Sequence, residues 1–267
     1  MRKKLYWKRP GKLWKKTLDR FQTISYAIAD MYLPEISISG EEIVKVLGFS
    51  ITNTFLLSLI ISAFIFILVV FSLRSSKIIP RGLQNFWELI LESLFNFFNS
   101  ITNNTKRTME IFPLAGTLFI LILFCNLLEL IPGVGIFHFL RSPSSDLNFT
   151  FALAIFSVIF INALVLKNLG LFTYLKRFLN KNPVLLFVGV LEGMGEITRI
   201  LSLAFRLFGN LFAGEILLIV TSFLFSYILP LPFLGLEILV GFIQAFIFSS
   251  LIVIFYSNSI QHGEHAV

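Results

Sequence analysis

The feature that most constrains this chain is a stretch of 25 residues, from Phe49 to Leu73, that contains no charged side chain. A helix of that length would measure about 37 Å at about 1.5 Å per residue, enough to cross a hydrocarbon core of about 30 Å. Over its 267 residues the chain is 56% hydrophobic and only 14% charged. A water-soluble protein of this size needs more polar surface than that. The sequence therefore predicts an all-α integral membrane protein.

Five further segments complete the predicted fold. Residues 81–105 repeat polar and apolar side chains every three or four positions, which predicts an amphipathic helix on the membrane surface. Residues 111–131 and 147–166 are two more apolar spans. The segment 184–229 holds 46 residues without a proline, and one helix of about 69 Å cannot stand upright in a bilayer. Together with 233–257 it predicts a long, strongly tilted hairpin, so about five helices are membrane-embedded.

Two of these spans carry recognisable residues near their starts. We place Pro113 in the first turn of its span, where a proline is tolerated because its missing N–H has no partner to lose. We expect Ser144, Ser145 or Asp146 to cap the span at 147–166, because these side chains accept hydrogen bonds from free amides at helix starts.

The two ends of the chain differ from the membrane segments. Nine of the 22 basic residues fall in the first twenty positions, so the net charge of +7 belongs to a tail rather than to a nucleic-acid-binding face. Residues 1–48 are predicted to form this basic tail and a polar lead-in, suited to anionic lipid headgroups, with an organelle transit peptide as the alternative. Residues 49–267 form a single membrane domain that ends in a tail at 258–267. Cys125 is the one cysteine, so no intrachain disulfide can form.

Basic residues in two connections set the expected orientation, because Lys and Arg near span ends favour the cytoplasmic side. These residues are Arg74, Lys77, Arg81, Lys106 and Arg107 in one connection, and Lys167, Lys176, Arg177 and Lys181 in the other. Both connections should face the cytoplasm, which places the N-terminal tail on the opposite side.

Charged residues and amides interrupt the apolar segments. They are Glu129, Glu192, Glu196, Arg199, Arg206, Glu215 and Glu237, with Asn210 and Gln244 as neutral companions. A charge at the bilayer centre costs about 2.5–3.5 kcal/mol on insertion scales, so each is a candidate for function. The alternative is that they pair and only hold helices together. Glu196 and Arg199 have the three-residue spacing of such a structural pair.

Arg206 lacks this spacing, because the nearest acidic residues of its segment lie ten positions before it and nine after it. Its counter-ion must come from another helix or another chain. At about 100° per residue, Arg206 shares one stripe with Arg199, Ser202, Gly209, Asn210 and Ala213. Ser202, Gly209 and Ala213 are small, so a neighbouring helix can approach closely. Tight packing within the same chain is the alternative.

The last segment carries a similar stripe of Glu237, Gly241 and Gln244. Low dielectric favours the neutral form of a carboxylic acid, which suits Glu215 and Glu237 to accept and release protons. A guanidinium group stays charged throughout. These residue types predict a proton passage through the carboxyl groups, with Arg206 as a fixed electrostatic gate.

Several motifs together carry a family resemblance. The segment RLFGNLFAGEIL at 206–217 is preceded by LSLAF and followed by IQAFIF. Further motifs are FWELILE at 86–92, SSDLNFT at 144–150, LEG at 191–193 and the HGEH end. In these motifs the chain resembles subunit a of F-type ATP synthases, the stator part of a rotary proton channel.

The resemblance implies a role for each candidate residue. The two long helices would curve around a ring of subunit c, and Arg206 would face the ring carboxylates and block a direct leak between two offset half-channels. Glu215, Glu237, Asn210 and Gln244 would line the half-channel on the side opposite the cytoplasm. Glu192 would belong to the cytoplasmic one.

The resemblance also implies partners and a location. The partners would be the subunit c ring, the subunit b peripheral stalk, the other ATP synthase subunits and membrane lipid, with no nucleic acid, cofactor or metal. The chain itself would be non-catalytic. Glu215 stands where mitochondrial relatives usually carry histidine, which favours a bacterial inner membrane over an organelle. Glu237 departs from many bacterial relatives, which carry histidine there, and sodium coupling is an alternative to proton coupling.

Two other functional classes fit the sequence less well. An independent proton-coupled transporter or channel commonly contains two repeated halves, and no internal repeat is evident here. An intramembrane hydrolase needs a base facing its nucleophile, whereas His138 lies in a connection and His262 and His265 lie in the tail. The same tail histidines, with Glu264, are a weak metal motif. No nucleotide-binding phosphate loop is present.

Overall fold

The computed structural model describes residues 42–46, 49–73, 82–128, 130, 142–171, 183–225 and 230–265. All of them belong to one compact unit, Ile38–Val267. Several predictions lie outside the described residues: the tail up to residue 41, the basic side chains at 74–81 and 176–181, Glu129 and His138. The side chains of His262, Glu264 and His265 are also outside this description.

The described part is built from helices. They are α2 (Asn53–Leu73), α3 (Leu83–Thr102), α4 (Thr105–Leu128), α5 (Leu147–Leu169), α7 (Pro183–Phe225) and α8 (Pro230–His265), with a short 3-10 helix η1 (Pro143–Ser145) before α5. Five of them, all except α3, are long and apolar enough to cross a membrane. This confirms the predicted fold class, an all-α multi-pass membrane protein with one additional amphipathic helix.

The first span begins later than Phe49, because a small antiparallel ribbon precedes it. Strand β1 (Glu42–Val46) pairs with β2 (Phe49–Thr52). The β-branched and aromatic side chains of this segment favour extended backbone. Thr52 then accepts a hydrogen bond at its Oγ1 atom from the Phe55 amide, 3.3 Å away, which is how a capping residue ends a strand and starts a helix.

Helix α3 and helix α4 are separated by only two residues. Asn103 adopts a left-handed backbone with φ of 51°, a conformation that asparagine tolerates and that ends a helix. Asn104 then accepts a hydrogen bond at Oδ1 from the Lys106 amide, 3.0 Å away. Helix α4 therefore starts at Thr105 rather than at residue 111, and Pro113 lies inside it rather than in its first turn.

Asp146 is the residue that caps α5, among the three that the sequence suggested. Its Oδ1 atom accepts a hydrogen bond from the Asn148 amide at 2.9 Å. Its Oδ2 atom accepts one from the Thr54 hydroxyl at 2.5 Å. Since Asp146 is only 2% exposed, one buried carboxylate joins the start of α2 to the start of α5.

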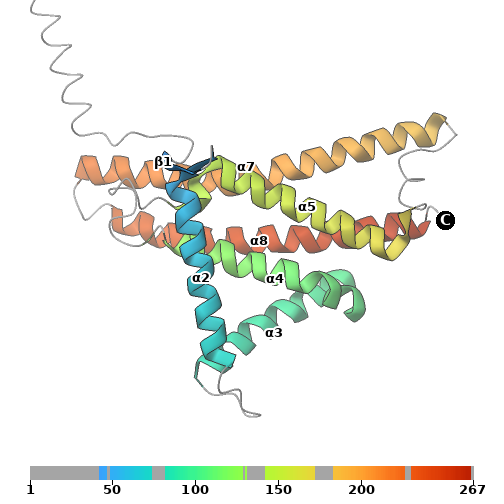
Figure 1. The fold of residues 1–267 in the computed structure, drawn as a ribbon, viewed down its shortest axis with the longest axis horizontal. Coiled ribbons are helices and arrows are strands. Elements are labelled where there is room, and N and C mark those ends of the chain that lie inside the picture. The colour runs from blue at the N-terminus through green and yellow to red at the C-terminus, as the bar shows by residue number, and fades with distance from the viewer. Residues whose placement is uncertain are drawn as a thin grey trace, which may run out of the picture. The chain divides into compact units, whose positions relative to one another are not determined.

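Helix α8 is the centre of the bundle and packs against α3, α4, α5 and α7. Its 36 residues and the 43 of α7 correspond to about 54 and 65 Å, so neither can stand upright across a hydrocarbon core of about 30 Å. In Figure 1 the two helices run across the direction of α2. The core that they share with α4 and α5 includes Ile111, Ile122, Leu203, Leu207, Phe248 and Ile252.

The predicted tail at 258–267 is wrong for the described residues, because α8 continues to His265. Ser259 and Ile260 are buried at 0% and 3% exposure, so this turn still packs against the bundle. Just before it, Tyr256 donates a hydrogen bond to Glu110 Oε2 at 2.6 Å. Asn168 donates to the same oxygen at 2.6 Å. This brace ties the end of α8 to the start of α4 and the end of α5.

Replacing Asp146 by alanine should destabilise the bundle by about 2–4 kcal/mol, because a helix cap is lost and the buried Thr54 hydroxyl loses its acceptor. Thr54→Val is the matched control, since it removes the hydrogen bonds of the Thr54 hydroxyl to Asp146 and Thr52 and keeps the cap. Thermal unfolding of the detergent-solubilised protein should show a larger drop in midpoint for Asp146→Ala than for Thr54→Val. Equal drops would mean that the cap contributes nothing.

Candidate functional site

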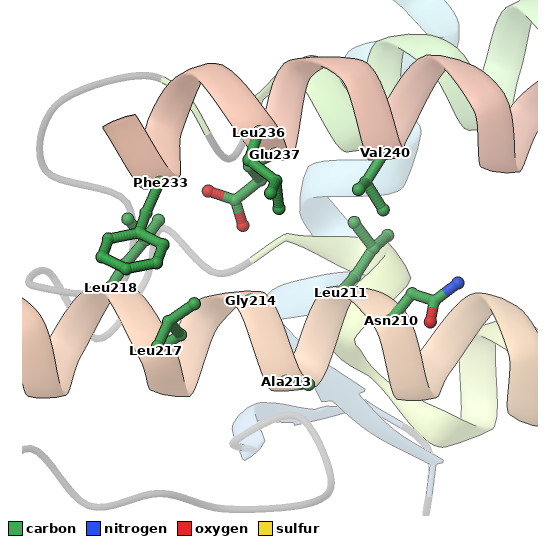
Figure 2. A pocket seen from close by; sticks show the side chains of 10 residues that line it. All are labelled: Asn210, Leu211, Ala213, Gly214, Leu217, Leu218, Phe233, Leu236, Glu237 and Val240. Atoms are coloured by element: carbon green, nitrogen blue, oxygen red, sulfur yellow. The ribbon is translucent and has the colours of Figure 1, made fainter. Parts of the chain in front are cut away.

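A cavity of about 260 Å³ lies between α7 and α8. It is lined by Asn210, Leu211, Ala213, Gly214, Leu217 and Leu218 from α7 and by Phe233, Leu236, Glu237 and Val240 from α8. Glu237 is the only ionisable residue in this lining, and it is 6% exposed. Figure 2 shows its carboxyl group pointing from α8 toward the backbone of α7.

Glu237 approaches α7 at a glycine. A Cβ atom placed on Gly214 would lie 2.7 Å from Glu237 Oε1, which is closer than non-bonded atoms tolerate. The missing side chain is therefore what lets the carboxyl group reach the α7 backbone. Gly214 immediately precedes Glu215, which is half-buried and does not line this cavity.

The next position of the α8 stripe, Gly241, packs against α4. A Cβ atom there would lie 3.0 Å from Asn126 Cβ. The Asn126 side chain donates a hydrogen bond from Nδ2 to the Gly241 carbonyl oxygen at 2.9 Å, and Asn126 is 2% exposed. Sequence reasoning did not select Asn126, although an amide within an apolar span was a signal that could have found it.

The third position of the stripe, Gln244, returns to α7. Its Oε1 atom accepts a hydrogen bond from Asn210 Nδ2 at 2.9 Å, and Gln244 is 2% exposed. The α8 stripe of Glu237, Gly241 and Gln244 is thus buried along its length. The structure brings together Asn210, Gln244 and Glu237, three of the residues that the sequence predicted for one half-channel.

Arg206 lies one helical turn before Asn210 on α7 and is half-buried. Its Nη2 atom lies 3.3 Å from Ser202 Oγ, to which it donates a hydrogen bond. Within the described part of the chain, no carboxylate lies within 4 Å of the guanidinium group. The small residues of its stripe, Ser202, Gly209 and Ala213, are all exposed. A Cβ atom on Gly209 would meet nothing within 4 Å, so this stripe is open.

Glu196 and Arg199 do not form the ion pair that their spacing allowed. Glu196 Oε2 instead accepts a hydrogen bond from Asn162 Nδ2 of α5 at 2.5 Å. The Arg199 guanidinium carbon lies 4.9 Å from the centroid of the Phe255 ring of α8, a cation–π contact. The two side chains point to different neighbouring helices, which is why three-residue spacing alone did not pair them.

Glu192 is half-buried and lies 14 residues before Arg206 on the same helix, about 21 Å along its axis. It is therefore remote from the cavity at Glu237. The candidate residues fall into two groups, one around the cavity and one toward the end of the bundle where α4 begins and α5 ends, with Arg206 between them.

This arrangement suits the movement of an ion better than a covalent reaction. A buried carboxyl group beside a cavity can take up and release a proton, whereas a guanidinium group holds its charge. Amide side chains such as Asn210 and Gln244 can donate and accept hydrogen bonds along the way. The open stripe beside Arg206 leaves room for a partner helix.

Comparison with known proteins agrees with this picture. Residues 54–257 match the family described as "ATP synthase A chain". The ATP synthase subunit a of Syntrophobacter fumaroxidans is 36% identical over 195 residues, which cover 71% of this chain and 77% of that protein. The subunit a of Moorella thermoacetica is 33% identical over 214 residues, covering 80% of this chain and 91% of that protein. Matches over so much of both sequences show that the chain belongs to the family of subunit a of F-type ATP synthases.

Proposed function

We propose that this chain is the proton-translocating stator subunit of an F-type ATP synthase. It provides two offset half-channels, and Arg206 faces the carboxylates of a rotating ring of subunit c. The chain catalyses no reaction itself, and ATP is made on other subunits. It resides in a bacterial inner membrane and contacts the ring, the subunit b peripheral stalk and lipid.

The observation that carries this proposal is the state of Arg206. A permanent cation in an apolar helix is costly unless an anion compensates it. No described carboxylate of the chain lies close enough to do so. The stripe around it is made of small, exposed side chains, which allow a second helix to approach closely. An acidic helix of another subunit fits both requirements.

The exposed residues of α7 support a protein or lipid neighbour along the same face. Met194, Ile197, Leu201 and Phe205 are 41–62% exposed and recur every three or four positions. They form an exposed apolar ridge that runs from Arg206 toward the start of α7. A ring of apolar helices would cover this ridge and meet the guanidinium group at its edge.

The cavity at Glu237 supports the half-channel opposite the cytoplasm. Glu237, Asn210 and Gln244 offer polar groups between α7 and α8, and Glu215 follows directly on the glycine that Glu237 approaches. A proton entering here would reach the ring carboxylate that Arg206 has just released. Because Arg206 repels further cations, the proton cannot pass directly to the other half-channel.

Glu192 is assigned to the second half-channel, which opens to the cytoplasm. Lys106 and Arg107 at the start of α4, and Lys167 at the end of α5, lie at the bundle end toward which Glu192 is displaced. Positive side chains favour the cytoplasmic side. The two half-channels then open at opposite ends of the bundle, as rotary coupling requires.

Replacing Arg206 by alanine should reduce ATP-driven proton uptake by inverted vesicles to background, because ring carboxylates would no longer be compelled to release their protons. Acidification is followed with a fluorescent pH probe. Thr198→Val is the control on the same helix, since Thr198 is exposed and bonds only to the Met194 carbonyl oxygen. Retained acidification by an inserted Arg206→Ala protein would refute the gate.

Replacing Gly214 by alanine should slow the same proton uptake on the order of tenfold, because the new Cβ would displace the Glu237 carboxyl group from α7. Gly235→Ala is the matched control on α8, where a Cβ meets nothing within 4 Å. The Gly235 variant should pump normally. If both variants pump at the original rate, the position of Glu237 against α7 does not matter for transport.

A further inference from the structure

The two oxygens of the Glu196 carboxyl group in α7 differ in their contacts. Asn162 of α5 donates a hydrogen bond to Glu196 Oε2 at 2.5 Å. The other carboxyl oxygen, Oε1, is buried and has no hydrogen-bond partner among the described residues. One oxygen of Glu196 is therefore fixed in place while the other remains available.

No cation neutralises this group within the described part of the chain. Arg199 is the nearest basic residue along α7, and its guanidinium group lies over the Phe255 ring instead. An ionised carboxylate with a single amide donor is poorly stabilised in low dielectric, and a neutral carboxylic acid there leaves its hydroxyl without an acceptor. The Glu196 Oε1 atom is therefore a buried oxygen at which a transferred proton can bind.

The brace at Glu110 shows how a structural carboxylate in the same bundle differs. Glu110 accepts hydrogen bonds from both Tyr256 and Asn168, so two helices hold it. Both carboxylates receive an amide from α5, six residues apart. Of Glu110 and Glu196, only Glu196 keeps a buried oxygen without a hydrogen-bond partner among the described residues.

Glu196 also lies in a suitable place. It is ten residues before Arg206 on α7 and four residues after Glu192. Ten residues correspond to about 15 Å along the helix axis, and four residues bring two side chains to the same face, one turn apart. Glu196 therefore stands between the gate and the cytoplasmic end, next to the acid already assigned to that half-channel.

We propose that Glu196 is a proton relay of the cytoplasmic half-channel and that Asn162 is its positioning residue. The inference rests on the proposed stator function. A proton leaves the ring carboxyl group, directly or through a water, and forms an O–H bond at Glu196 Oε1. That bond then breaks as the proton passes to a water or to Glu192, which restores the carboxylate. Asn162 keeps Oε2 bound, so that Oε1 takes the proton.

Two substitutions of Glu196 separate a relay from a structural contact. Glu196→Gln keeps the size and the hydrogen bond to Asn162 but cannot carry a proton as an acid. Glu196→Asp keeps the acid and shortens the side chain. A relay predicts that the Asp variant conducts better than the Gln variant, whereas a purely structural role predicts the reverse order.

The readout is passive proton flux through vesicles from which the catalytic subunits have been stripped, driven by a potassium diffusion potential. Glu196→Gln should lower this flux on the order of 100-fold, the range of one lost acid–base group, and Glu196→Asp should retain part of it. Asn162→Leu should lower the proton flux less than Glu196→Gln does. Asn162→Gln, which keeps an amide donor, should conduct better than Asn162→Leu. Glu110→Gln is the matched control and should conduct normally, because Glu110 serves only the brace.

The outcomes distinguish this inference from the proposed function. Normal flux in Glu196→Gln, with coupling still lost in Arg206→Ala, would overturn the relay and leave the stator function standing. Retained coupling in Arg206→Ala would remove the stator function itself. Subunit c that co-purifies with each variant reports assembly. Failure of both Glu196 variants to assemble would make Glu196 structural and would also overturn the relay.

Discussion

The structure depends on one unmet electrostatic requirement, the compensation of the Arg206 guanidinium group in an apolar helix. Its single hydrogen bond within the described residues is to Ser202, and a hydroxyl group carries no opposite charge. Because arginine cannot lose its proton under physiological conditions, deprotonation cannot remove this electrostatic cost. In the proposed function the compensating anion is a carboxylate of subunit c, which approaches Arg206 along the exposed small residues on either side of it.

The two long helices differ in the burial of their stripes. Helix α7 exposes its small-residue stripe, whereas α8 buries its own stripe of Glu237, Gly241 and Gln244 against α7 and α4. The glycines make this possible, because Gly214 admits the Glu237 carboxyl group and Gly241 admits Asn126. The buried contacts fix α8 in the bundle, and the small-residue face of α7 stays exposed. We propose that the ring of subunit c moves past this exposed face while α8 remains fixed.

Hydropathy and helix length were enough to predict five membrane-embedded helices, the last two of which form the long hairpin, because lipid disfavours exposed polar groups and limits the length of an upright helix. The boundaries were harder to predict. Local hydrogen bonds decide them, as at Asn104 before α4, and tertiary burial decides them at Ser259, where α8 continues. Partners across helices were the least predictable. The three-residue spacing suggested an ion pair between Glu196 and Arg199. In the structure Glu196 instead contacts α5 and Arg199 contacts α8. Asn126 and Asn162 were overlooked because only charges and two amides were considered.

The most direct test of the central claim is site-specific cross-linking of α7 to subunit c in assembled membranes. Cys125 is first replaced by alanine, and a single cysteine is then placed at Ala213 on the exposed stripe or at Ala204, which is 0% exposed. Both substitutions change alanine to cysteine on the same helix. With cysteines placed along the outer helix of subunit c, Ala213→Cys should form a disulfide to the ring and Ala204→Cys should not. Absence of cross-links from Ala213→Cys, in complexes that retain subunit c, would contradict an Arg206 stripe that faces the ring.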